Sequence, residues 1–100
     1  MDMYSHYKLV LKLPVGTAHE ANTELDIIDD LRTSSEEASY AINEDGTQRD
    51  EAKWYEANEE LKDFSKKYPG VVFVLSKESA DPEEFGYGVI ETAVCDGSYV

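Results

Sequence analysis

The chain has 100 residues, of which 41% are apolar or aromatic and 31% are charged, enough for one hydrophobic core but not for two. The 22 acidic and 9 basic residues give a formal net charge of −13, which argues against direct binding to nucleic acid or to an anionic membrane, because both attract basic surfaces. The one cysteine, Cys95, excludes an internal disulfide and a cysteine-cluster metal site. Because the sequence contains no apolar run long enough to span a membrane and no signal-peptide pattern, we expect one cytoplasmic domain over residues 1–100.

The first third of the chain is expected to form a strand followed by a helix. Apolar and polar residues alternate over residues 4–13, which is the period of a strand. Thr17 and Glu20 then have the spacing of a capping box, which predicts a helix from there to about Arg32. The expected apolar face of this helix comprises Ala18, Ala21, Leu25, Ile27, Ile28 and Leu31.

The middle of the chain combines a short strand, a turn and the most regular helical pattern in the sequence. Residues 37–43 alternate, with Ala38, Tyr40 and Ile42 on one face, which predicts a strand. The Asp-Gly pair at residues 45–46 predicts a turn, since this pair tolerates positive φ. A helical stripe with spacings of three and four residues follows, formed by Trp54, Ala57, Leu61, Phe64 and Tyr68.

The last third is expected to complete an antiparallel sheet. Residues 71–75 are apolar without interruption, which predicts a buried strand, and residues 85–94 predict another strand that bends at its glycines. The Asp96-Gly97 pair predicts a hairpin turn into residues 98–100. The expected fold class is therefore α+β, a ferredoxin-like sandwich in which two helices pack on one face of a mostly antiparallel sheet of four to five strands.

The second half of the chain also has a distinctive order of features. An aromatic-led helix ends in Ser-Lys-Lys-Tyr-Pro at residues 65–69, and a buried strand, an acidic loop at residues 81–84 and a strand closing in Asp96-Gly97 follow. This order over residues 52–100 resembles small phage- and plasmid-associated bacterial proteins that contain a YubB-like ferredoxin-type domain. The resemblance implies a fold and a mobile-element setting in a bacterial host cytosol, but no catalytic or ligand residues. The sequence departs from the family pattern in the loop at residues 78–87.

The titratable residues form no catalytic or metal-binding pattern. His6 is expected to point outward from a strand and His19 to lie in the first turn of a helix, without metal-ligand spacing between them. The charge of Asp96 beside Cys95 is expected to raise the pKa of the thiol, the opposite of what a nucleophile needs. Adjacent carboxylates on a helix or strand point apart, so they cannot act as an acid–base pair. We therefore expect no enzymatic activity, no cofactor and no metal.

Acidic residues are concentrated in one part of the chain. Residues 13–60 carry 14 acids and 3 bases, whereas residues 61–77 carry one acid and four bases. Carboxylates along a helix and its following loop can take the places of successive phosphates, and so can bind lysines and arginines that otherwise hold nucleic acid. The sequence therefore predicts a phosphate-mimicking surface. Its expected partner-binding residues are Asp26, Asp29, Asp30, Glu36, Glu37, Glu44 and Asp45.

The expected partner of such a surface is a protein with a basic nucleic-acid-binding groove. A CRISPR effector is the first choice and a restriction enzyme or other host nuclease the next, which would make the chain an anti-CRISPR or anti-restriction inhibitor. In the alternative, the acidic surface is merely solvated and keeps the protein soluble. The chain would then be a non-catalytic interaction module of unknown partner, self-associating as a homodimer through the edge of its C-terminal hairpin.

Overall fold

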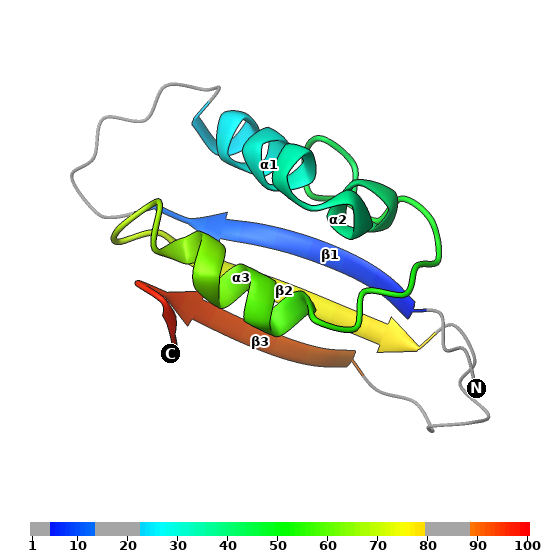
Figure 1. The fold of residues 1–100 in the computed structure, drawn as a ribbon. Coiled ribbons are helices and arrows are strands. Elements are labelled where there is room, and N and C mark those ends of the chain that lie inside the picture. The colour runs from blue at the N-terminus through cyan, green and yellow to red at the C-terminus, as the bar shows by residue number, and fades with distance from the viewer. Residues whose placement is uncertain (1–4, 14–22, 80–88) are drawn as a thin grey trace.

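The structure is a computed structural model that describes residues 5–13, 23–79 and 89–100. It is an α+β fold in which three helices lie on a four-stranded antiparallel sheet (Figure 1). In chain order the elements are β1 (Ser5–Lys12), α1 (Thr23–Ser34), α2 (Glu36–Ala41), α3 (Ala57–Ser65), β2 (Val72–Ser79), β3 (Val89–Cys95) and β4 (Ser98–Tyr99). Within the described residues, no helix is long and apolar enough to cross a membrane.

The strands follow one another across the sheet in the order β1-β2-β3-β4, each antiparallel to its neighbour. The register places Leu9 opposite Leu75, and Leu75 opposite Thr92. The chain passes from β1 to β2 through all three helices, which lie on one face of the sheet (Figure 1). The other face of the sheet carries no helix among the described residues, and we call it the open sheet face.

The core lies between the sheet and the helices, as the alternation in β1 predicts. Tyr7, Leu9 and Leu11 are buried, while the residues between them are partly or fully exposed. Helix α1 buries Ile27, Ile28 and Leu31 as expected, whereas Leu25 is 44% exposed. The rest of the buried apolar set comprises Ala38, Ala41, Ile42, Ala52, Trp54, Ala57, Leu61, Phe64, Val71, Phe73, Leu75 and Val94.

The stripe predicted around α3 is confirmed, although the helix is shorter than the stripe. Trp54 precedes the helix and is 1% exposed, with its ring edge-on to Tyr7 at a centroid distance of 5.5 Å. Phe64 packs edge-on against Phe73 at 5.7 Å, and Tyr68, after the helix, packs against Phe64 at a centroid distance of 5.4 Å. The stripe therefore anchors the helical layer to β1 at one end and to β2 at the other.

The strand expected over residues 37–43 is wrong, because residues 36–41 form helix α2. The Ser35 hydroxyl accepts a hydrogen bond from the Ala38 N–H and so caps the helix, and Glu36 and Glu37 in its first turn suit the helix dipole. Ala38 and Ala41 are buried one helical turn apart, while Tyr40 points outward and is 55% exposed. The ferredoxin-like arrangement expected from that strand is not confirmed.

The predictions for the C-terminal strands hold, with one difference. The strand expected at residues 71–75 is confirmed and is longer, but only one of its sides is covered, so half-exposed valines alternate with the buried Phe73 and Leu75. The predicted hairpin turn is confirmed, with φ of 52° at Asp96 and 81° at Gly97. Three expected features lie outside the described residues: the capping box at residues 17–20, the acidic loop at residues 81–84 and the strand start at residues 85–88.

The segment between α2 and α3 runs along the outer edge of β1. The predicted turn at residues 44–46 is present, and the carbonyl of Gly46 accepts a hydrogen bond from the Leu9 N–H at 2.8 Å. Ser5 and Ala52 exchange two backbone hydrogen bonds of 2.9 Å. These contacts cover part of an edge that would otherwise be free to pair with another strand.

Candidate functional site: the acidic helical surface

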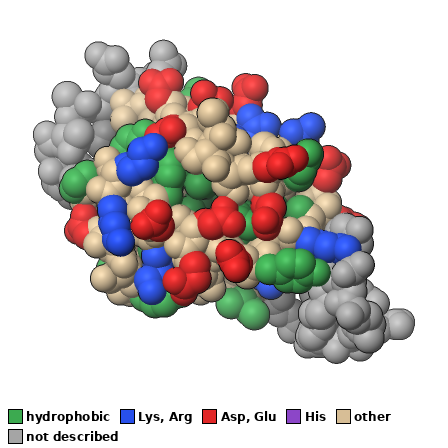
Figure 2. Space-filling model, in the orientation of Figure 1, with side chains coloured by type: hydrophobic (Ala, Val, Ile, Leu, Met, Phe, Trp, Pro, Cys, Tyr) green, Lys and Arg blue, Asp and Glu red, His purple; other side chains and the backbone are tan. Residues whose placement is uncertain are grey.

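Exposed carboxylates are spread across the helical layer on the side facing away from the sheet (Figure 2). We define the acidic helical surface as the exposed or half-exposed carboxylates of α1, α2 and α3 other than Asp30, which faces α3, together with the residue that precedes α3: Glu24, Asp26, Asp29, Glu36, Glu37, Glu56, Glu59, Glu60 and Asp63. All of these side chains lie off the buried stripes of their helices. The surface is therefore a consequence of where the apolar residues fall.

Few basic side chains compensate this charge. Lys62 lies 3.9 Å from Glu59, and Lys66 lies 3.6 Å from Asp63, both as neighbours along α3. Within the part of the chain that the structure describes, no ion pair involves any of the following carboxylates: Glu24, Asp26, Asp29, Glu36, Glu37, Glu56 and Glu60. The surface thus carries a net negative charge that the fold itself does not neutralise.

Glutamates of α2 and of the first half of α3 repel one another where α2 begins beside α3. Partial desolvation raises the pKa of the Glu37 carboxyl, and repulsion from Glu60, Glu56 and Glu36 raises it further. Local contacts hold two of these side chains in place: Glu36 accepts a hydrogen bond from the Tyr40 hydroxyl at 2.9 Å, and Glu60 accepts one from the Ser35 hydroxyl. We call Glu36, Glu37, Glu56 and Glu60 the carboxylate cluster.

The three predicted contact residues on α1 do not act alike. Asp26 and Asp29 are exposed. Asp30 instead faces α3, where its carboxylate accepts hydrogen bonds from the Tyr68 hydroxyl at 2.6 Å and from Lys67 Nζ at 2.9 Å. These two hydrogen bonds, the one from Tyr68 first, lower the pKa of Asp30. Asp30 therefore ties α1 to the end of α3, and this internal role leaves it less free to bind a partner.

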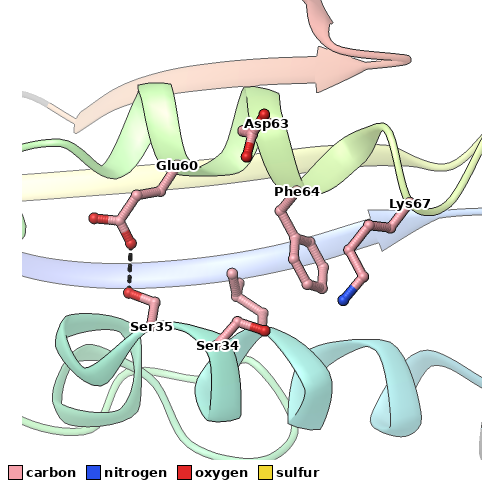
Figure 3. Close-up of a pocket in the computed structure, with 7 residues that line it drawn as sticks. Ser34, Ser35, Glu60, Asp63, Phe64 and Lys67 are labelled. Atoms are coloured by element: carbon pink, nitrogen blue, oxygen red, sulfur yellow. Dashed lines mark hydrogen bonds between the residues drawn. The ribbon is translucent and has the colours of Figure 1, made fainter.

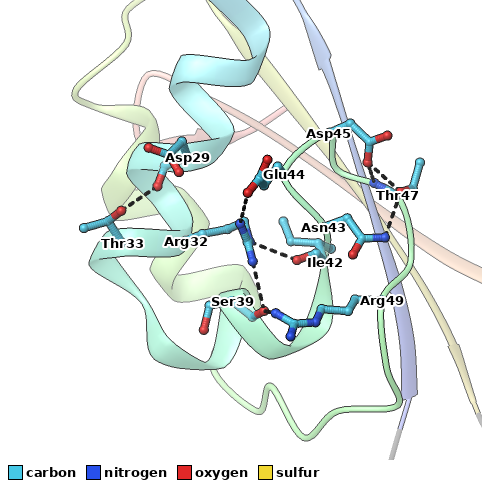
Figure 4. Close-up of polar contacts among 10 residues, drawn as sticks. All are labelled: Asp29, Arg32, Thr33, Ser39, Ile42, Asn43, Glu44, Asp45, Thr47 and Arg49. Atoms are coloured by element: carbon cyan, nitrogen blue, oxygen red, sulfur yellow. Dashed lines mark hydrogen bonds and ion pairs between the residues drawn. The ribbon is translucent and has the colours of Figure 1, made fainter.

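The predicted residues Glu44 and Asp45 belong to the turn after α2 (Figure 4). Arg32 donates a hydrogen bond to the Ile42 carbonyl at 3.0 Å and lies 3.9 Å from the exposed Glu44 carboxylate. Asp45 accepts hydrogen bonds from both the backbone N–H and the hydroxyl of Thr47, and these lower the pKa of Asp45. Both carboxylates have local structural partners and lie apart from the carboxylate cluster.

The seven predicted residues are therefore divided among α1, where Asp30 faces α3 and the other two face outward, the start of α2 and the turn after α2. The fold brings Glu36 and Glu37 together with residues that the sequence argument did not include, chiefly Glu56 and Glu60. The signal for these two was present, because both lie off the Trp54–Tyr68 stripe. What the sequence could not show was that α3 begins next to α2.

A hollow of about 240 Å³ lies beside the carboxylate cluster, between α1 and α3 (Figure 3). Leu31 and Phe64, both buried core residues, form its floor. Polar side chains surround it: Ser34, Ser35, Glu60, Asp63 and Lys67. It is smaller than the roughly 300–1,000 Å³ of typical small-molecule sites.

Of the histidines and the cysteine considered for chemistry, the structure describes His6 and Cys95. Among residues 5–13, 23–79 and 89–100, no three His, Cys, Asp or Glu side chains come together in a way that could hold a metal ion. Burial raises the pKa of the Cys95 thiol, and the hydrogen bond and charge of Asp96 raise it further, the direction that the sequence predicts. His19 lies outside the described residues.

No protein-family model, curated protein or solved structure matches this chain.

Proposed function

We propose that this chain is a non-catalytic inhibitor that binds the basic nucleic-acid groove of a host defence nuclease through its acidic helical surface. The observation that carries the proposal is the carboxylate cluster, in which Glu37 is held next to three further glutamates without a basic partner in the described residues. Repulsion between like charges is unfavourable in the free protein and contributes to the raised pKa of Glu37. A partner that brings lysines and arginines would turn this repulsion into attraction.

Carboxylates and phosphates are bound by the same basic side chains, which is the physical basis of the proposed mimicry. Arginine forms paired hydrogen bonds with either group, and lysine attracts both as a point charge. A strongly negative surface also raises the rate at which a positively charged partner is met. Both effects weaken as salt concentration rises, because exposed charges are screened.

The biological setting of the proposal comes from the resemblance of residues 52–100 to phage- and plasmid-associated proteins. A protein encoded by a mobile element meets host systems that target foreign nucleic acid, so a CRISPR effector is the first partner to test and a restriction enzyme the second. Both must hold nucleic acid in a positively charged channel. The chain would occupy that channel without nucleic acid of its own.

Competition between the chain and DNA for a nuclease tests this function. Purified CRISPR effector–guide complexes and restriction enzymes are incubated with increasing amounts of the chain, before or after labelled target DNA is added, and DNA binding and cleavage are measured. We expect one nuclease class to lose DNA binding when the chain is added first, with weaker inhibition at 200 mM than at 50 mM salt, about the range over which phosphate contacts lose most of their affinity. DNA binding and cleavage unchanged across the panel would contradict the proposal.

A second candidate function rests on a different observation, the exposed apolar residues at the start of β3 and in the C-terminal segment that includes β4. Val89, Ile90, Tyr99 and Val100 are 55%, 67%, 52% and 73% exposed, and β4 has only two residues, so it leaves much of the β3 edge unpaired by a described strand. An edge of this kind can pair with another strand, which favours an interaction module that self-associates.

Sedimentation at several protein concentrations separates the two candidates. Self-association through the hairpin edge predicts a dimer at micromolar concentration, and Ile90→Lys should abolish this dimer. Competition with DNA for a nuclease does not require the dimer. A monomer at all concentrations that still competes with DNA would leave only the inhibitor. A dimer that survives Ile90→Lys would remove the hairpin edge as the interface.

A further inference from the structure

The hollow between α1 and α3 combines two features that rarely occur together on a surface. Its floor is apolar, made of the buried side chains Leu31 and Phe64. Its rim is acidic on the α3 side, where Glu60 and Asp63 lie one turn of helix apart (Figure 3). An apolar floor alone would fit an apolar side chain, and a carboxylate rim alone would fit any cation. The two together fit a side chain with a long apolar stem and a charged end.

The geometry of Glu60 suits it for receiving a charged hydrogen-bond donor. Its side chain is half-buried and its Oε1 atom accepts a hydrogen bond from the Ser35 hydroxyl, which fixes the carboxylate in place. Two oxygens give a carboxylate more acceptor sites than one hydroxyl fills. Because the carboxylate is already held, a partner's donor need not order it, and less entropy is lost on binding.

The chain itself already holds one basic side chain at the other end of the hollow. Lys67 Nζ lies 5.2 Å from the centroid of the Phe64 ring and 2.9 Å from the Asp30 carboxylate. An ammonium group over an aromatic ring and beside a carboxylate is a stable arrangement for a cation. The Lys67 contact shows that the environment accepts a basic side chain. At the other end, Glu60 has no ion pair among the described residues, and Asp63 lies 3.6 Å from the exposed Lys66.

We infer that this hollow is the anchor site for one arginine side chain of the protein partner. The inference deepens the proposed function and rests on it for its biological meaning. The aliphatic stem of the arginine would lie over Leu31 and Phe64, and its guanidinium would donate hydrogen bonds to Glu60 and Asp63. Arginine fits better than lysine because its planar donors can reach two carboxylates at once and its weakly hydrated charge tolerates partial burial. Arginine is also the basic residue most often found as an interface anchor.

The test uses a small probe, so that it does not depend on finding the partner. The ¹⁵N-labelled chain is titrated with acetyl-Gly-Arg-Gly-amide and, separately, with the same peptide carrying citrulline, a neutral residue of the same shape. Amide shifts are followed by NMR. We expect the arginine peptide to shift amides at residues 34–35 and 60–67, and the citrulline peptide to produce shifts at least tenfold weaker at equal concentration.

Matched variants then locate the site. Glu60→Gln keeps the side-chain shape and an oxygen that the Ser35 hydroxyl can donate to, so the fold should be unchanged. It should nevertheless weaken peptide binding about tenfold, the effect of one lost charged hydrogen bond. Glu78→Gln removes the same charge from an exposed strand position and should leave binding unchanged. Unchanged spectra of the free variants serve as the folding control.

The outcomes separate this inference from the proposed function. Equal shifts with both peptides, unchanged binding to Glu60→Gln, or shifts spread over the helices without any at the hollow would overturn the arginine site even if the chain competes with DNA for a nuclease. If the arginine peptide binds at the hollow as expected while no nuclease is inhibited, the site stands and the proposed function fails.

Discussion

The helical layer and the open sheet face differ sharply in charge. Seven of the nine carboxylates of the acidic helical surface have no ion pair among the described residues, and Glu59 and Asp63 pair with Lys62 and Lys66. On the open sheet face, acidic and basic residues balance: Lys8 lies opposite Ser76, which lies opposite Glu91. The same face also carries an apolar row across the strands, in which Val10 lies opposite Val74. Both faces are reached by solvent, so a need for solubility alone would not put the negative charge on one of them.

Helix formation explains the contrast only in part. Acids in the first turn suit the helix dipole, as Glu36 and Glu37 do in α2, but elsewhere in a helix lysine, arginine and glutamine are about as favourable as glutamate. The raised pKa of Glu37, caused by desolvation and by repulsion from neighbouring glutamates, indicates that the charged arrangement is unfavourable for the free protein. The preference for acidic over basic residues on the acidic helical surface is therefore the feature that a function has to explain.

Removing a core contact of the helical layer should have the largest effect on stability. Leu61 on the inner side of α3 is fully buried. Leu61→Ala should lower the free energy of unfolding by about 2–5 kcal/mol, because it leaves a cavity in the core. Val10 on the open sheet face is 43% exposed. Val10→Thr keeps a β-branched residue there and should change the free energy of unfolding by less than about 0.5 kcal/mol. Urea unfolding measures both, and equal losses would mean that the two faces are not packed differently.

The turn that joins the helical layer to the edge of β1 should be the next most sensitive point. Gly46 has φ of +86°, and a Cβ atom there would lie 2.3 Å from the Leu9 carbonyl oxygen. Gly46→Ala should therefore cost more than the roughly 1–2 kcal/mol of positive φ alone. Gly97→Ala is the matched control, since Gly97 also has positive φ but a Cβ would meet only the flexible Lys66 side chain. A larger loss of unfolding free energy at Gly97 than at Gly46 would contradict the role of this turn.

Two acids of the helical layer should respond in opposite ways when neutralised. The pKa of Asp30 is lowered by its contacts with Tyr68 and Lys67, so Asp30 stabilises the fold above its unfolded pKa of 3.8, and this contribution is lost as the pH falls through the folded value. Asp30→Asn should lower the unfolding free energy at pH 7 by up to about 1 kcal/mol, and the difference from the unchanged chain should shrink towards pH 3.

Glu37 is the matched comparison for Asp30. Because desolvation, and after it repulsion from neighbouring glutamates, raises the pKa of Glu37, the charged form is destabilising, and Glu37→Gln should leave the stability at pH 7 unchanged or slightly higher. A clear loss of unfolding free energy in Glu37→Gln, measured in the same urea series, would show that this carboxylate has a structural partner and would weaken the argument for an unpaired surface.

The smallest expected effect is a change in the pKa of one tyrosine hydroxyl, that of Tyr68. Burial raises the pKa of the Tyr68 hydroxyl to about 12, and its hydrogen bond to Asp30 contributes to the shift. Asp30→Asn should bring this pKa down towards the ordinary value of 10.0, whereas Glu37→Gln should not move it. Ultraviolet absorbance of the phenolate during an alkaline titration follows the change, and an identical curve for all three proteins would place Tyr68 outside the influence of Asp30.

Local patterns predicted most of the elements but not how the helices meet. The Trp54–Tyr68 stripe, the β1 alternation and the Asp96-Gly97 turn each carry their own signal, and all three are confirmed. Residues 37–43 were misassigned because Ala38, Tyr40 and Ile42 fit a strand period while the spacing of Ala38 and Ala41 fits a helix equally well. Capping by the Ser35 side chain favours the helix. Ser35 is not followed by a glutamate three residues later, so the sequence shows no capping box at this position.

The candidate site could be predicted only in part for the same reason. Glu36 and Glu37 were identified from the density of acids along the chain, and they belong to the carboxylate cluster. Glu56 and Glu60 were not, because their proximity depends on tertiary packing of α2 beside α3. Asp30 was included although its carboxylate is engaged by Tyr68 and Lys67, residues nearly 40 positions away. Counting charges along the sequence identifies the acidic residues, but only the fold shows which of their carboxylates are paired with other side chains.

Two double charge reversals provide the most direct test of the acidic helical surface as the binding surface. Glu37→Lys with Glu56→Lys changes the carboxylate cluster, and Glu78→Lys with Glu91→Lys changes exposed strand positions by the same net charge. Affinity for the inhibited nuclease is measured by competition with labelled DNA. The first pair should weaken inhibition about tenfold or more, because attraction becomes repulsion, while the second should change it by less than about twofold. Urea unfolding of both variants checks that the fold survives, since a lysine in the first turn of α2 opposes the helix dipole. Equal losses from both pairs, or a loss from the second pair alone, would contradict the account.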